Sequence, residues 1–111
     1  MKIAVIGSRT FDDAKFLSET LDAHNISLLI SGGASGADAL AEQYAHQKGV
    51  KTHIIKPDYK RFGRGATFVR NKEIVLSSEM LIAFWDGKSK GTQYTIEMAR
   101  THNVKVQVKY F

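Results

Sequence analysis

The chain has 111 residues and no cysteine, which excludes disulfide scaffolds, thiolate zinc sites and cysteine nucleophiles. Its longest apolar run, residues 80–85, falls far short of the roughly 20 residues that cross a bilayer. The apolar run at residues 3–6 is too short for a secretory signal. We therefore expect one domain over residues 1–111, located in the cytoplasm.

The net charge of +5 has a local origin. The segment from Lys56 to Lys72 holds six basic residues and a single acid, Asp58, so it accounts for the whole excess. The remainder of the chain is neutral. Such a segment is either a solvated basic loop or a contact for an anionic partner such as a nucleotide or nucleic acid.

Apolar runs alternate with helix-period segments along the whole chain. In chain order, the pattern predicts a strand at 2–6, a helix at 12–23, a strand at 27–31, a helix from 37 to a C-cap at Gly49, a strand at 50–56, a loop, a helix at 67–77, a strand at 80–85, a helix at 92–103 and a strand at 104–109. Near-continuous apolar strands between helices are typical of parallel sheets covered on both faces. The predicted fold is α/β, a Rossmann-like three-layer sandwich around a mainly parallel five-stranded sheet.

Glycine-rich or polar clusters follow four of the predicted strands. They comprise residues 7–9, 31–38, 57–58 and 85–92. Because ligands of open α/β sheets bind beyond the carboxyl ends of the strands, these clusters predict one ligand site at that edge.

The loop at 31–38 is the main candidate. Its three glycines allow close approach of a ligand, and the helix that follows offers unpaired N–H groups to a phosphate. A tight turn with Ser35 as N-cap and Asp38 as its partner is the structural alternative. The candidate ligand-binding residues here are Ser31, Gly32, Gly33, Ala34, Gly36 and Asp38.

The other strand ends supply the remaining candidates. Arg9 either clamps a phosphate or ties down a neighbouring loop. Trp85 either stacks on a base or packs beneath its loop, and Ser89 or Thr92 either caps a helix or holds a phosphate. The full set from these segments is Gly7, Ser8, Arg9, Arg70, Asn71, Trp85, Asp86, Ser89, Gly91 and Thr92.

Metal and cofactor signals are weak. The four histidines form no short ligand pair, and no carboxylate spacing suggests a cation cage. No G-x-S-x-G nucleophile elbow occurs either. We expect neither a metal nor a cofactor.

Four motifs in this order resemble the YspA/YpsA-related branch of the SLOG superfamily: GSR-x-F at 7–11, SGGASGAD at 31–38, GRGATFVRN at 63–71 and WDGKSKGT at 85–92. Relatives include the LOG phosphoribohydrolases and DNA-processing protein A. The resemblance implies a Rossmann-like fold, a nucleotide or nucleotide-derived ligand at the strand ends, and a homodimer as in LOG enzymes. The apolar residues Ile74, Val75 and Leu76 offer an exposed face for that dimer.

The resemblance departs from the LOG pattern in one catalytic residue. Arg70 matches the LOG arginine and Gly91-Thr92 matches the G-T of its loop, but no glutamate follows Thr92 directly. A glycosidic cleavage needs a carboxylate to stabilise its oxocarbenium-like transition state, so Asp38 or Asp86 would have to serve.

Three functions remain open. The first is a sensor or sequestering module for AMP, ADP-ribose or an NAD-like ligand, a role that SLOG domains serve in bacterial and phage conflict systems. The second is a nucleotide N-glycosidase that uses Arg70 and Asp86. The third is binding of single-stranded nucleic acid, suggested by Tyr59, Phe62 and Phe68 within the basic segment. None involves a membrane.

Overall fold

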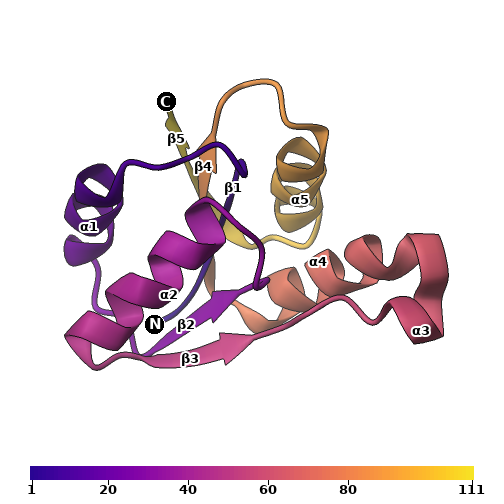
Figure 1. The fold of residues 1–111 in the computed structure, drawn as a ribbon, viewed down its shortest axis with the longest axis horizontal. Helices are drawn as coiled ribbons and strands as arrows, with labels where there is room; N and C mark the ends of the chain where they lie inside the picture. The colour runs from indigo at the N-terminus through magenta and orange to yellow at the C-terminus, as the bar shows by residue number, and fades with distance from the viewer.

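All five predicted strands are present, and they form one parallel sheet (Figure 1). The computed structural model describes residues 1–111. The sheet order is β3-β2-β1-β4-β5, with every neighbouring pair parallel. The strands are β1 (Lys2–Gly7), β2 (Leu28–Ser31), β3 (Lys51–Ile54), β4 (Met80–Trp85) and β5 (Lys105–Tyr110). This arrangement confirms the Rossmann-like α/β sandwich.

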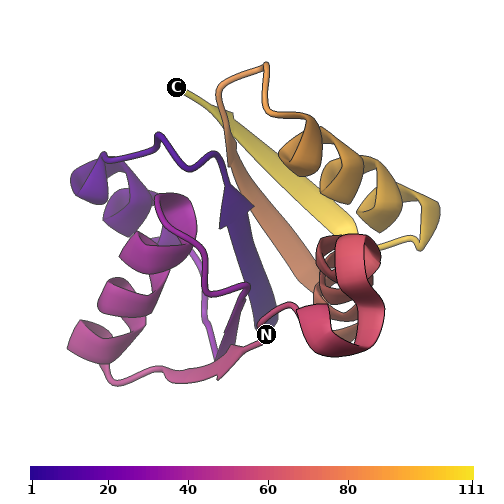
Figure 2. The ribbon, with the colours of Figure 1, turned by 45° about the vertical axis from the view of Figure 1, so that its right-hand side comes forward.

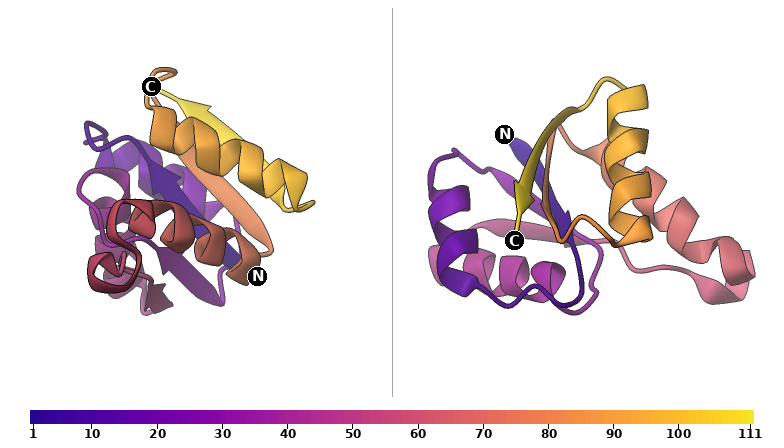
Figure 3. Two further views of the ribbon diagram at one scale, coloured as in Figure 1. Left: turned by 90° about the vertical axis from the view of Figure 1, so that its right-hand side faces the viewer. Right: turned by 90° about the horizontal axis from the view of Figure 1, so that it is seen from above.

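Helices cover both faces of the sheet (Figure 3). The pair α1 (Ala14–Asp22) and α2 (Ala37–Lys48) lies on one face, and the pair α4 (Ala66–Ser77) and α5 (Lys90–Thr101) lies on the other. Alternation along each strand divides the core accordingly. In β1, Ile3 and Val5 pack toward α1 and α2, while Ala4 and Ile6 pack toward α4 and α5. No helix is long and apolar enough to cross a bilayer.

The main departure from the predicted elements lies between β3 and α4. The predicted loop contains a short helix, α3 (Tyr59–Phe62), followed by the 3₁₀ turn η1 (Gly63–Gly65). Asp58 caps α3, since its side chain accepts the Arg61 N–H at 3.1 Å. This segment follows β3 and packs against α4 (Figure 2). Four residues show no helical period, so only the capping Asp58 signals this helix in the sequence.

Two predictions about the helices, an exposed face and an N-cap, are wrong. Ile74 and Val75 are 1% and 0% exposed, so only Leu76 of the proposed dimer face reaches solvent. Consecutive helical residues are turned about 100° apart, and three in a row cannot share one face. Gly36, not Ser35, is the N-cap of α2, and no side chain caps that helix.

Candidate functional site

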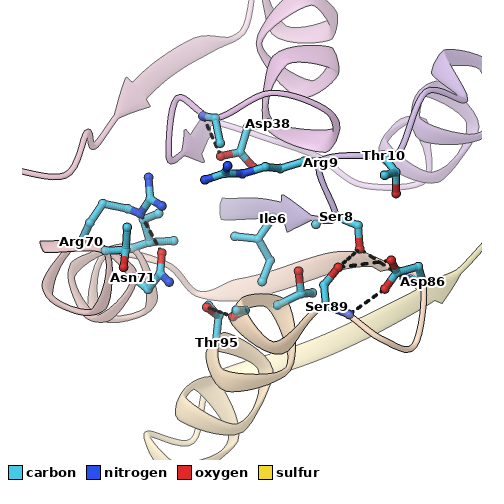
Figure 4. Close-up of a pocket in the computed structure, with 16 residues that line it drawn as sticks. Ile6, Ser8, Arg9, Thr10, Asp38, Arg70, Asn71, Asp86, Ser89 and Thr95 are labelled. Atoms are coloured by element: carbon cyan, nitrogen blue, oxygen red, sulfur yellow. Dashed lines mark hydrogen bonds between the residues drawn. The ribbon is translucent and has the colours of Figure 1, made fainter. Parts of the chain in front are cut away.

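A cavity of about 420 Å³ opens at the carboxyl ends of β1 and β4 (Figure 4). β4 lies on one side of β1, whereas β2, the next strand in the chain, lies on the other side. The direction in which strands are added to the sheet therefore reverses between β1 and β4. Open α/β sheets bind ligands at this switch point. The volume lies within the range of about 300–1,000 Å³ that small-molecule sites occupy. Only three of the sixteen lining residues are hydrophobic, which favours a polar ligand.

Arg70 reaches the cavity from α4 and is held in place from two sides. Its Nη1 donates to the Gly32 carbonyl, and its Nε donates to Asn71 Oδ1 at 2.7 Å. Gly32 makes room for the guanidinium, because a Cβ there would lie 2.6 Å from Nη1. The ion pairs of the molecule involve only α1 and α2 residues, so no carboxylate pairs with Arg70. Its positive charge is therefore available to an anion.

Arg9 approaches the same space from the loop after β1. Its side chain extends over the cavity toward Arg70 (Figure 4), and it too makes no ion pair. Gly91 and Thr92 add the first turn of α5 to the cavity wall, and no side chain caps that turn. Two guanidinium groups and an uncapped helix N-terminus together form an environment suited to a phosphate.

Asp38 lies in the first turn of α2 and is 6% exposed. Its Oδ2 accepts the Ala34 N–H at 3.1 Å, which orders the loop between β2 and α2. Burial raises the pKa of this carboxyl above its ordinary value, against the lowering effects of the Ala34 N–H and the Arg70 charge. Asp38 thus shapes the cavity wall while presenting little surface to a ligand.

The Asp86 carboxylate is hydrogen-bonded within its own loop. Its Oδ1 accepts the N–H groups of Lys88 and Ser89, both at 2.8 Å, and its Oδ2 accepts the Ser89 hydroxyl at 3.2 Å. These hydrogen bonds hold the pKa of Asp86 below its ordinary value. The carboxylate therefore stays ionised and orders the turn before α5.

Ser8 joins this turn to the loop after β1. Its Oγ lies 2.8 Å from Ser89 Oγ and accepts the Asp86 N–H at 3.3 Å, and the residue is only 2% exposed. The cavity floor is thus tied together across two loops that are far apart in the sequence.

The structure brings most of the predicted site residues together around this cavity. Those that line it are Gly7, Ser8, Arg9, Ala34, Asp38, Arg70, Asn71, Asp86, Ser89, Gly91 and Thr92. The predicted residues Ser31, Gly32, Gly33, Gly36 and Trp85 do not line it.

The glycines outside the cavity have packing roles. Gly32 seats the Arg70 guanidinium. Gly36 has a φ of +76°, and a Cβ there would lie 2.5 and 2.6 Å from the carbonyl oxygens of Ser8 and Arg9. The glycine-rich loop is therefore built for close crossing of backbone segments, and only Ala34 and Asp38 of it face the cavity.

Trp85 packs beneath its loop, as one of the two alternatives for it proposed. Its Nε1 donates to the Ser89 carbonyl at 3.0 Å, and its ring lies 5.7 Å from that of Tyr110. Its ring is thus occupied within the protein.

Sequence reasoning missed five lining residues: Ile6, Thr10, Thr67, Ile74 and Thr95. A signal existed for two of them. Thr67 and Ile74 lie three residues before Arg70 and three after Asn71, so helical spacing places them on the face of α4 that carries both.

The fold and the site define a Rossmann-like protein with a polar cavity at its switch point, lined by two arginines and two aspartates. The chain belongs to the YspA, cpYpsA-related SLOG family (YAcAr), whose model matches residues 1–62. It is 28% identical over 116 residues to the Gene 61 protein of Mycobacterium phage D29, covering 95% of this chain and 93% of that protein.

Two solved structures share the fold. DNA processing protein A from Streptococcus pneumoniae superposes with a TM-score of 0.81 at 23% identity, over 96% of this chain and 49% of that one. The Helicobacter pylori protein of the same name gives a TM-score of 0.76 at 21% identity, over 97% and 64%. The chain thus spans about half to two-thirds of the length of these proteins.

Proposed function

We propose that the chain binds a nucleotide or nucleotide-derived ligand, such as AMP, ADP-ribose or an NAD-like molecule, in the cavity at the switch point. The observation that carries this proposal is the pair of unpaired guanidinium groups, Arg9 and Arg70, over a polar cavity. Guanidinium groups recognise phosphate oxygens with two parallel hydrogen bonds. The hydroxyl and amide side chains of the lining, among them Thr67 and Asn71, suit the ribose.

Titration calorimetry tests this proposal with AMP, ADP-ribose, NAD and unphosphorylated adenosine. We expect binding that requires a phosphate. Arg70→Met and Arg9→Met should each raise Kd by about tenfold to a hundredfold, the worth of a charge-assisted hydrogen bond. Arg100→Met is the matched control, since Arg100 is exposed in the last turn of α5. Adenosine that binds as tightly as AMP, or no binding of any nucleotide, would contradict the proposal.

The geometry favours binding without cleavage. Both carboxylate oxygens of Asp86 accept hydrogen bonds within its own loop, and Asp38 is nearly buried. Neither is placed to trap or stabilise an oxocarbenium-like centre. Incubation with each nucleotide should therefore release no free base. Base release that is lost in Asp86→Asn would establish the N-glycosidase instead.

Single-stranded nucleic acid is the second candidate. The Helicobacter pylori DNA processing protein A is described by a single-stranded DNA binding mode. In this chain, Tyr59, Phe62 and Phe68 are 59%, 38% and 50% exposed. Around them, no cation of the segment 56–72 pairs with a carboxylate. Exposed aromatic rings among cations that pair with no carboxylate suit unpaired bases and their phosphates, although the Arg61 guanidinium lies 5.0 Å from the centre of the Phe62 ring.

Fluorescence anisotropy of a labelled oligothymidine tests this candidate. Affinity should fall steeply between about 50 and 200 mM salt, because phosphate contacts release counterions. Tyr59→Ala and Phe68→Ala should weaken binding, whereas Tyr110→Ala, which removes an equally exposed ring elsewhere, should not. An affinity that is independent of salt would remove this candidate and leave the cavity proposal unaffected.

A further inference from the structure

The outer face of α4 carries a stripe of four exposed residues, Val69, Lys72, Glu73 and Leu76. Their spacing of three, four and seven residues places them on one side of the helix. Val69 is 39% and Leu76 is 59% exposed. The cavity-lining side chains of α4 point the other way, with Ile74 packed into the core.

Nothing within the chain covers this stripe. The helix packs against β1, β2, α3 and α5, and Figure 3 shows it at the margin of the molecule. Lys72 and Glu73 take part in no ion pair. Two apolar and two charged side chains are therefore left without partners on one helix face.

The order of these residues is symmetric about its centre. Val69 and Leu76 lie at equal distances on either side of the Lys72–Glu73 step. A two-fold axis through that step would set a second α4 antiparallel to the first. Val69 would then meet the partner's Leu76, and Lys72 would meet the partner's Glu73. A parallel copy would place like charges together, which is unfavourable.

We propose that this stripe is a homodimer interface in which two copies of α4 pack antiparallel across a two-fold axis. Such a contact is isologous, because one patch on each copy serves both sides. The stripe is electrically balanced and self-complementary, which fits a second copy better than an anionic strand. The proposal is independent of the ligand, because the cavity lies on the opposite side of α4. With only two turns of helix in contact, the dimer should be weak.

Sedimentation equilibrium at protein concentrations up to about 1 mM, the affinity range of weak association, tests the interface through a charge-reversal cycle. Symmetry makes each single change, Lys72→Glu or Glu73→Lys, break two ion pairs and create two repulsions. We expect each to raise the dimer Kd by about tenfold. The double variant restores opposite charges across the axis, so its Kd should return to within about threefold of the wild-type value. Lys15→Glu on α1, on the other side of the sheet, is the control.

Cysteine pairing tests the register, since the chain has no cysteine of its own. Under mild oxidation, the double variant Val69→Cys with Leu76→Cys should form a covalent dimer. Each single variant should not, because the two copies of one position would lie about 10 Å apart along the helix, beyond the reach of a disulfide. A wild-type chain that stays monomeric overturns the proposal. A dimer whose double charge reversal fails to recover, or whose single cysteine variants cross-link as readily, overturns it as well.

Discussion

Gly32→Ala should displace Arg70 from the cavity while leaving the fold intact. An added Cβ would lie 2.6 Å from Arg70 Nη1 and 3.0 Å from Asp38 Oδ2, so one of the neighbours must move. Arg70 Nη1 is the far end of a long, flexible side chain, so it can turn away without a shift of the backbone. The hydrogen bond from Nη1 to the Gly32 carbonyl would then be lost.

The size of the effect follows from that hydrogen bond. A bond from a charged donor contributes about 1.5–3 kcal/mol, and the lower end applies because Arg70 is half-buried. An unfolding entropy of about 2.1 cal/mol/K per residue makes 1 kcal/mol worth about 4 °C in a chain of 111 residues. We therefore expect Tm to fall by about 4–8 °C and the nucleotide Kd to rise by about tenfold to a hundredfold.

Differential scanning fluorimetry and titration calorimetry measure the two effects on the same protein. Gly65→Ala is the control, because a Cβ there meets nothing within 4 Å and Gly65 does not line the cavity. If Gly32→Ala binds the nucleotide as tightly as the wild type while Arg70→Met binds it more weakly, then Gly32 does not determine the position of Arg70. A loss of Tm beyond about 15 °C, on the same scale of 4 °C per kcal/mol, would show that the neighbours cannot yield.

Three further changes test other parts of the structure. Gly36→Ala should cost more than about 3 kcal/mol in urea unfolding, because its φ of +76° and two backbone oxygens within 2.6 Å leave no room for relaxation. Because the pKa of Asp38 is raised in the folded protein, protonation of this carboxyl stabilises the fold; that stabilisation is complete below pH 3.8 and is lost as the pH rises through the pKa of the folded state. Asp38→Asn should therefore make Tm depend less on pH above pH 3.8, and an unchanged dependence would contradict this. Tyr44 donates to Asp22 Oδ1 at 2.6 Å, with burial and this carboxylate raising the pKa of Tyr44 to about 12. Tyr44→Phe should cost about 1 kcal/mol and remove the last tyrosine to ionise in an ultraviolet titration.

The main strands and helices could be predicted because their burial is visible in the sequence. The run at 80–85 is apolar throughout because β4 is buried on both faces of the sheet, with alternate residues in the two core clusters. The segment 59–65 could not, since a four-residue helix and a 3₁₀ turn depend on Asp58 and on local backbone geometry rather than on a repeating pattern.

The location of the candidate site could be predicted because parallel strands share a carboxyl edge. The roles of individual residues could not, since they depend on contacts between distant segments. Gly32 matters through Arg70, which lies 38 positions later in the chain. Trp85 ends its strand as predicted, but only the Ser89 carbonyl and the Tyr110 ring determine which way it faces.

The hydrogen bond between Ser8 and Ser89 has a consequence for how a ligand would be received. Together with the Asp86 N–H it fixes the loops after β1 and β4 relative to each other within the protein itself. A ligand would bind to loops that already have their final conformation, so binding would cost little backbone conformational entropy there. Binding at this edge should therefore involve little backbone movement, with conformational change confined to the long arginine side chains.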